Sequence, residues 1–484
     1  MSRTLTYAAR LANEWLDGLA ERPVKARASL EELRARFSGP LPVEPSAPDD
    51  VISTLDRDMR DGLLGSAGGR FFAWVIGGGL ESALAADWLV STWDQNAALY
   101  ACGPAVSVVE EVAGEWLKDL FDLPREASFG FTTGCQLAHM TCLAAARHAV
   151  LKRQGWDIEA DGLQGAPHLR VIVNDQKHGS IQQAVNFLGL GQRALVPIET
   201  HGDGRIPIGS FARTLSEADE ATIVVLNAAD LNVGACDDFE ALIPIAKEAG
   251  AWVHVDGAFG LFARASAKHR HLVRGLEDAD SWATDGHKWL NVPFDCGVAI
   301  IRDQAAHKAA MTISAPYIDA GGAARDQIDW NPEWSRRARG VPVYAALREL
   351  GRSGVEDLVD RCCAHCADIV SGIGALPGVE IVSEPTLNQG LLRFSRKGAS
   401  PEDNDDYTDC VIHEINETGE TFFSGTTWQG RRAMRVSVVN WRTSEDDVRR
   451  AVAAATRVLS HYHRPGDGSR SVARGRSGKE IPRE

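Results

Sequence analysis

Two neighbouring stretches decide the fold: A-W-V-H-V-D-G-A-F-G at residues 251–260, and D-S-W-A-T-D-G-H-K-W-L-N-V-P-F-D-C-G-V-A-I-I-R at residues 280–302. Each contains a short apolar run of strand length, at 251–255 and at 297–301. The first run ends at Asp256, and the loop before the second carries His287 and Lys288. Open α/β sheets bind ligands beyond the carboxyl ends of their strands. The sequence therefore predicts a ligand site that contains Asp256 and Lys288.

An aspartate and a lysine placed in this way suit pyridoxal phosphate. The lysine amine forms a Schiff base with the cofactor, and the carboxylate keeps the pyridine nitrogen protonated so that the ring accepts electrons. Taken alone, an aspartate at a strand end is more often a helix cap, and a lone lysine is usually a solvated charge. The combination of the two, in this local sequence, favours the cofactor site.

The chain resembles the group II pyridoxal-dependent amino-acid decarboxylases in two blocks, H-V-D-G-A at 254–258 and H-K-W-L at 287–290. That family includes the aromatic-L-amino-acid, histidine and glutamate decarboxylases, and the resemblance extends over roughly residues 5–463. It implies the aspartate-aminotransferase-like fold type I and a homodimer with the active site at its interface. It also implies a carboxy-lyase that converts an L-amino acid to the amine and carbon dioxide.

Apolar runs of strand length alternate with helical segments along the chain, which predicts an α/β fold with a mostly parallel sheet covered on both faces. We expect four parts. An N-terminal helical segment at 1–68 embraces the partner subunit, and a large cofactor-binding domain follows at 69–335. A smaller C-terminal α/β domain occupies 336–463, and a disordered basic tail occupies 464–484. Within these parts, two helices are expected in 5–37, the second capped by Ser29, and one helix over 80–123.

The resemblance places further residues around the cofactor. His178 matches the family histidine that stacks on the pyridine ring, and Ala258 is small enough to pack on the opposite face. Asn232 falls where the family has a polar residue near the cofactor. Tyr317, in a stretch rich in glycine and alanine, matches the loop tyrosine that returns a proton to the substrate Cα.

The phosphate of the cofactor is expected at the turn Gly134-Cys135-Gln136, which opens a helix and so offers free backbone N–H groups. Cys135 and Gln136 depart from the small and hydroxyl residues of the family, but backbone amides bind phosphate whatever the side chain. Asp285 and His287 lie where the family places an asparagine and a histidine against the phosphate. A carboxylate repels phosphate, so Asp285 is protonated, turned away or bonded to the surroundings of Lys288.

The resemblance implies that residues 69–79, which read G-R-F-F-A-W-V-I-G-G-G, lie over the active site and line the substrate pocket. Phe72 and Trp74 are either pocket walls or plain core aromatics. Arg70 is the only charge there, whereas an acidic substrate needs a second cation for its distal carboxylate. A neutral and in particular an aromatic L-amino acid is therefore favoured. Arg435 is equally compatible with a salt bridge and with a ligand role.

Composition excludes several classes of protein. A net charge of −15 argues against a general nucleic-acid binder. No signal peptide and no apolar run of membrane-spanning length is visible, and nine cysteines without a signal indicate reduced thiols in the cytoplasm. The cysteines at 362, 363 and 366 are expected as buried thiols on a helix, and no metal site is predicted.

Three classes of function remain, of which an amino-acid decarboxylase is favoured. The second is another pyridoxal-dependent reaction on an amino acid or amine: oxidative aldehyde synthesis, carbon–carbon lysis or transamination. Relatives that make aldehydes tend to replace the loop tyrosine or the stacking histidine, and this chain keeps both. The third is a scaffold without catalysis, against which the presence of Lys288 argues.

Overall fold

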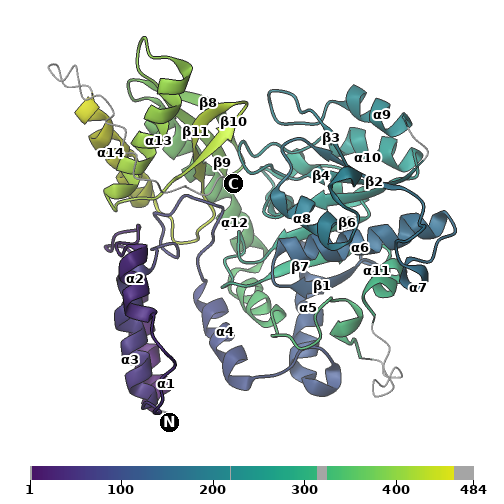
Figure 1. The fold of residues 1–484 in the computed structure, drawn as a ribbon, viewed down its shortest axis with the longest axis horizontal. Helices are drawn as coiled ribbons and strands as arrows, with labels where there is room; N and C mark the ends of the chain where they lie inside the picture. The colour runs from purple at the N-terminus through teal and green to yellow at the C-terminus, as the bar shows by residue number, and fades with distance from the viewer. Residues whose placement is uncertain (1–2, 218–219, 313–323, 463–484) are drawn as a thin grey trace.

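The computed structural model describes residues 3–217, 220–312 and 324–462 (Figure 1). Its larger sheet has seven strands in the order β1-β7-β6-β5-β4-β2-β3. Strand β7 runs antiparallel to both neighbours, and the remaining pairs are parallel. The strands are β1 (Ser128–Thr132), β2 (Leu169–Asn174), β3 (Leu195–Ile198), β4 (Ala221–Asn227), β5 (Trp252–Asp256), β6 (Ser281–Asp285) and β7 (Gly297–Ile301). The predicted mostly parallel α/β sheet is confirmed.

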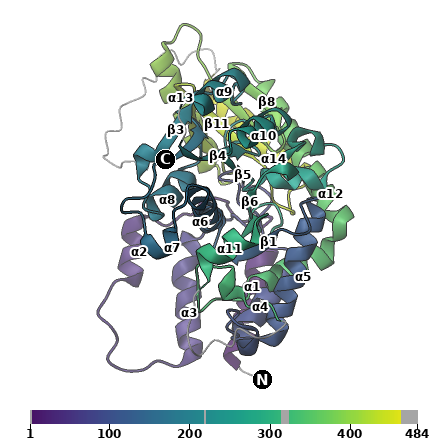
Figure 2. The ribbon, with the colours of Figure 1, turned by 90° about the vertical axis from the view of Figure 1, so that its right-hand side faces the viewer.

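Helices cover both faces of this sheet because side chains alternate between the faces along each strand. On β4, Ile223 and Val225 belong to one buried cluster, and Val224 and Leu226 belong to the other. Figure 2 shows α6 (Cys135–Arg153) and α8 (Gly179–Phe187) on one side of β5 and β6, with α5 (Pro104–Leu120) and α12 (Gly340–Gly374) on the other. Burial on both faces requires the near-continuous apolar strands that the sequence carries.

A smaller antiparallel sheet has four strands in the order β10-β11-β9-β8. The strands are β8 (Val379–Thr386), β9 (Gln389–Phe394), β10 (Ser424–Trp428) and β11 (Arg431–Ser437), with helices α13 (Pro401–Glu417) and α14 (Glu445–Tyr462). Helix α12 contacts this sheet at one end and α5 at the other, so it joins the two sheets. It is interrupted at Gly351, whose φ of +60° departs from helical geometry, and its three cysteines are buried. The domain boundaries drawn from the sequence stay predictions.

Three helices form an N-terminal arm that extends away from the rest of the chain in Figure 1: α1 (Arg3–Asp17), α2 (Leu30–Phe37) and α3 (Pro48–Met59). The predicted cap at Ser29 is confirmed. Its hydroxyl accepts the Glu32 N–H at 3.2 Å, while the Glu32 carboxylate accepts the Ser29 N–H at 2.7 Å.

The single helix expected over 80–123 is wrong, because the structure divides it into α4 (Glu81–Trp93) and α5. Helix α4 ends where Asp94 adopts the left-handed conformation, with φ of +50°. Gly103 and Pro104 then begin the next helix, with the proline at a position where its missing N–H costs no hydrogen bond.

The segment 70–72 ties the N-terminal part to the small sheet. The Arg70 guanidinium is 2% exposed and donates hydrogen bonds to the carbonyls of Ala20, Arg22 and Glu420, each at 2.8 Å. Phe71 forms an isolated parallel bridge with Phe422.

The remaining helices are α7 (Ile158–Asp161), α9 (Ile208–Ser216), α10 (Phe239–Glu248) and α11 (Gln304–Met311). Within the described ranges, no helix combines the length and the apolar character that crossing a membrane requires.

Candidate active site

A cavity of about 600 Å³ lies at the carboxyl ends of the parallel strands. The register of the sheet sets its floor, because Asn227 of β4 pairs with Asp256 of β5, and Asp285 of β6 pairs with Gly297 at the start of β7. The lining residues are Trp74, Gly134, Cys135, Gln136, Gln176, His178, Ser180, Asn227, Ala229, Asp230, Leu231, Asp256, Ala258, Phe259, Asp285, His287, Lys288 and Arg435. Strand ends from the large sheet and β11 of the small sheet therefore enclose one site.

Asp256 ends β5 and is 8% exposed. Its Oδ1 accepts the Ala258 N–H at 3.1 Å and lies 3.5 Å from Nε2 of His139. Burial favours the neutral acid, but the nearby histidines and the Lys288 amine outweigh it, so the pKa of Asp256 lies below its usual value. The carboxylate is thus ionised and able to hold a cationic ring nitrogen.

Lys288 lies in the loop between β6 and β7, with its amine 3.2 Å from Oδ2 of Asp285. Burial alone lowers the pKa of this amine, but the Asp285 carboxylate, with Asp256 behind it, outweighs burial and raises the pKa. Lys288 and Asp256 line the same cavity, as their positions in the sequence predict.

The structure shows the position of the Asp285 carboxylate, which the sequence left open. The carboxylate is not turned away from the site, and it lies beside the Lys288 amine. Its Oδ1 accepts the backbone N–H of Cys135 at 2.6 Å, at the first turn of α6, and lies 3.6 Å from Nε2 of His287. A carboxylate is favourable at a helix N-terminus. It therefore occupies one of the backbone donors expected to bind the phosphate.

The phosphate turn itself is tightly built. Gly134 packs against Gly297, where an added Cβ would lie 2.3 Å from the Gly134 backbone, so only glycine fits at 297. Gly134, Cys135 and Gln136 all line the cavity. The Nδ1 of His287 accepts the Cys296 N–H at 3.2 Å, which leaves the ring proton on Nε2 of the neutral imidazole, facing Asp285.

His178 caps α8 and lines the cavity together with Ala258. Its Nδ1 accepts the Ser180 N–H at 3.2 Å and lies 2.7 Å from the Ser180 hydroxyl, which fixes the orientation of the ring. The structure therefore brings the predicted stacking residue and the predicted small residue to one site.

Two of the expected residues, Asn232 and Phe72, do not line this cavity. Asn232 is turned toward the small sheet, where its side-chain oxygen accepts the Thr426 hydroxyl at 2.7 Å. Phe72 is fully buried and packs on Phe423 with ring centroids 5.4 Å apart, so it is a core aromatic and not a pocket wall in this chain. Trp74, at 42% exposure, does line the cavity. Tyr317 lies outside the described residues.

Sequence reasoning missed Asp230 and Phe259 and left Arg435 undecided, yet all three line the cavity. Asp230 follows the end of β4 by three positions, a signal of the same kind as the one that identified Asp256. Arg435 is 4% exposed on β11, so it faces the site and not the solvent.

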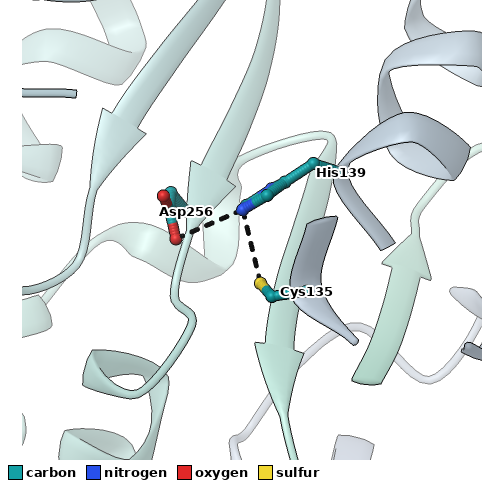
Figure 3. Close-up of side chains that lie close together, drawn as sticks. All are labelled: Cys135, His139 and Asp256. Carbon is teal, nitrogen blue, oxygen red and sulfur yellow. Dashed lines mark hydrogen bonds and ion pairs between the residues drawn. The ribbon is translucent and has the colours of Figure 1, made fainter. Parts of the chain in front are cut away.

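The donor set fits pyridoxal phosphate: an amine that opens into the cavity for its aldehyde carbon, an ionised carboxylate for its ring nitrogen, and a cavity of sufficient size. Asp285 is the one group that opposes its phosphate. Among the described residues, Cys135, His139 and Asp256 also place their donor atoms within 4.8 Å of one another, as a metal site would (Figure 3). These atoms already contact one another, with Sγ of Cys135 at 3.3 Å from Nε2 of His139, and we interpret them as a hydrogen-bonded cluster.

Comparison with known proteins agrees with this donor set. The family model of the pyridoxal-dependent decarboxylase conserved domain matches residues 31–397. The chain is 25% identical over 456 residues to the aromatic-L-amino-acid decarboxylase of Bacillus atrophaeus, which covers 92% of this chain and 93% of that protein. It is 29% identical over 399 residues to the L-2,4-diaminobutyrate decarboxylase of Rhizobium meliloti (strain 1021), which covers 79% of this chain and 77% of that protein.

The fold also has a close counterpart among solved structures. Oryza sativa TDC with PLP and tryptamine matches with a TM-score of 0.89 at 22% identity, over 95% of this chain and 98% of that one. The chain thus belongs to the pyridoxal-dependent decarboxylase family, and it is a pyridoxal-phosphate-dependent amino-acid carboxy-lyase.

Proposed function

We propose that this chain decarboxylates a neutral, in particular an aromatic, L-amino acid in the cavity described above, with Lys288 as the residue that binds the cofactor covalently. The observation that carries the proposal is the position of Lys288 and Asp256 on the wall of one cavity, at the ends of neighbouring strands. The Lys288 side chain is 19% exposed and opens into the cavity, and the low pKa of Asp256 keeps its carboxylate ionised.

Bound pyridoxal phosphate supplies an electron sink for the pair of electrons that carbon dioxide leaves behind. In this proposal Asp256 holds the proton on the ring nitrogen, because an ionised carboxylate stabilises the pyridinium charge. His178 and Ala258, which line the same cavity, would hold the ring between them. The return of a proton to Cα by Tyr317 stays a prediction.

The position of Arg435 in the cavity wall favours a substrate that has one carboxylate. Among the described lining residues, Lys288 and Arg435 are the only lysine and arginine. With Lys288 committed to the cofactor, we assign the α-carboxylate to Arg435, and a distal carboxylate finds no second guanidinium or ammonium among the described lining residues. Trp74, Leu231 and Phe259 offer apolar and aromatic surface to a neutral side chain.

A homodimer is part of the same proposal. Helix α4 exposes Trp88, Leu89 and Trp93, each at 40% or more. Beside them, an apolar cavity of about 530 Å³ is lined by residues of α4, α5 and α12, including Val106 and Tyr344. Exposed apolar surface of this kind supports a contact with another chain. The N-terminal arm extends away from the rest of the chain (Figure 1), and we assign it to the same contact.

The experiment pairs cofactor trapping with product analysis. Wild type loaded with pyridoxal phosphate should give a borohydride-reducible link at Lys288, and Lys288→Ala should lose it, because Lys288 is the only lysine among the described residues that line the cavity. Lys268→Ala, which removes an exposed lysine paired with Asp360, is the control and should keep the link. A specific reducible link that survives in Lys288→Ala would refute the assignment.

Substrate and reaction type are tested on a panel of aromatic L-amino acids, L-histidine, L-2,4-diaminobutyrate and L-glutamate. Carbon dioxide release together with the amine, greatest for an aromatic substrate, supports the proposal. A preference for L-glutamate would contradict the argument from Arg435. Release of aldehyde, ammonia and peroxide in place of the amine would replace decarboxylation by oxidative aldehyde synthesis.

A further inference from the structure

Asp256 is the end of a chain of buried polar side chains that runs away from the cavity. Its Oδ1 lies 3.5 Å from Nε2 of His139, and Nδ1 of His139 lies 2.9 Å from Nε2 of His254. The Nδ1 of His254 lies 2.9 Å from the Ser281 hydroxyl, which accepts the Trp252 indole N–H at 2.9 Å. Figure 3 shows His139 pointing from its helix toward Asp256.

The ion-pair contact at Asp256 and the hydrogen bonds beyond it have one consistent direction. An ionised Asp256 only accepts, so Nε2 of a neutral His139 carries the proton and its Nδ1 accepts. His254 must then donate from Nε2 and accept at Nδ1, which the Ser281 hydroxyl satisfies. The indole of Trp252 only donates, and it completes the series at Ser281. Every polar hydrogen points toward Asp256.

The surroundings keep both imidazoles neutral. His139 and His254 have no exposed surface, and burial lowers the pKa of His139 and lowers that of His254 to about 3. The other charged or titratable groups around His139 are the Cys135 thiol on its own helix and His178, Asp285 and Lys288 across the cavity. Asp256 therefore faces the N–H dipole of His139, whose positive end opposes the effect of burial on the carboxylate.

We propose that His139 and His254 form a relay of positioning residues that keeps Asp256 ionised and thereby keeps the proton on the cofactor's ring nitrogen. The inference rests on the proposed function, since it requires the ring nitrogen to face Asp256. A buried carboxyl group that loses its polar partner is more stable in the protonated, neutral form. Without the relay, the proton shared between ring and carboxylate moves to Asp256, and the electron sink weakens.

The test reads the ring nitrogen directly. Holoenzyme is prepared with pyridoxal phosphate labelled with ¹⁵N in the ring, and the nitrogen chemical shift is measured without substrate at neutral pH. Wild type should show the pyridinium shift. In His139→Phe the ratio of protonated to neutral nitrogen should fall by at least about tenfold, the worth of one charge-assisted hydrogen bond. His139→Gln, whose amide both accepts and donates, should recover most of the wild-type shift.

Two further variants keep the test decisive. His254→Phe removes the hydrogen-bond donor to His139 without changing Asp256. Either ring nitrogen of His139 can then carry the proton. The ¹⁵N chemical shift of the cofactor should therefore change in the same direction as in His139→Phe. This variant also serves if His139→Phe does not fold. His307→Phe removes another fully buried histidine, which contacts Ser128 and the Trp330 carbonyl, and should leave the ring nitrogen unchanged.

The outcomes separate the relay from the proposed function. An unchanged nitrogen shift in His139→Phe or His254→Phe overturns the relay while the covalent link at Lys288 still stands. A wild-type nitrogen that is neutral overturns it as well. Loss of the borohydride-reducible link from wild type would instead remove the proposed function, and the relay with it.

Discussion

The carboxylate of Asp285 lies 3.2 Å from the amine of Lys288 and at the same time accepts the first backbone N–H of helix α6. One acidic side chain thus bridges the residue expected to bind the cofactor and the turn expected to bind its phosphate. It also contributes most of the effect that raises the pKa of Lys288. Both consequences oppose cofactor loading, because a phosphate is repelled and a protonated amine is not a nucleophile.

Asp285→Asn should therefore strengthen cofactor binding. The amide oxygen still accepts the Cys135 N–H, while the repulsion of the phosphate and the ion pair with Lys288 disappear. We expect the dissociation constant of pyridoxal phosphate to fall by roughly tenfold and covalent loading to become faster at neutral pH. Absorbance titration of the apoenzyme measures both. Asp295→Asn, which affects a partner of Arg339 outside the cavity lining, is the control. Weaker binding in Asp285→Asn would mean that the carboxylate assists the site.

Asp256→Asn should bind the cofactor and yet lose catalysis. An amide cannot stabilise a protonated ring nitrogen, so the electron sink fails, and turnover should fall by about 100-fold or more, the scale of other preorganised electrostatic contacts. Cofactor content from absorbance and carbon dioxide release from the preferred substrate give the two readouts. Turnover equal to that of wild type would remove Asp256 from the mechanism.

Arg435 should matter for substrate binding more than for cofactor binding. Replacement by methionine keeps much of the side-chain volume but removes the charge, and kcat/KM should fall by roughly 10- to 100-fold, the worth of a hydrogen bond between charged groups. Arg432→Met on the same strand, where Arg432 pairs with Asp409 at the surface, should change kcat/KM little. If both variants behave alike, Arg435 supports the small sheet and does not touch the substrate.

Acid should destabilise the protein through its buried histidines. Burial lowers the pKa of His307 and of His254 to about 3, whereas an unfolded chain titrates near ~6.5. The unfolded state therefore binds more protons between these values, and stability present above pH ~6.5 is lost as pH falls toward ~3. His307→Gln should reduce this slope by one proton, about 1.4 kcal/mol per pH unit. Urea unfolding at pH 6.5 and pH 5 measures how the free energy of unfolding changes with pH. His413→Gln, which replaces an exposed histidine, is the control.

Strong local signals made part of this structure predictable from the sequence. The predicted bounds of β7 and the predicted cap at Ser29 match the structure. Both signals, an apolar run between turns and a serine followed by Glu32, are contained within a few residues. The helix break at Asp94 was missed because apolar spacing continues across it, and a left-handed aspartate leaves no periodic mark.

Within the site, sequence motifs located Lys288 and Asp256 but not what surrounds them. Whether Arg435 faces the solvent or a cavity depends on how the small sheet packs, which no local pattern encodes. Phe72 and Trp74 have similar chemistry and are two positions apart, yet the packing of Phe72 on Phe423 buries one and leaves the other in the cavity wall. His139 contacts Asp256 only because α6 packs against β5 in the folded chain.

The bridge between Phe71 and Phe422 has a consequence for biosynthesis. A ribosome delivers the seven strands of the large sheet well before it delivers β10 and β11. During that interval Lys288 and Asp256 have been synthesised but Arg435 has not, and Phe71 and Phe72 lack the partners that bury them. Exposed aromatic residues make partly synthesised chains prone to aggregation. The time between the synthesis of β7 and that of β11 is therefore the interval in which Phe71 and Phe72 add most to the tendency of the chain to aggregate.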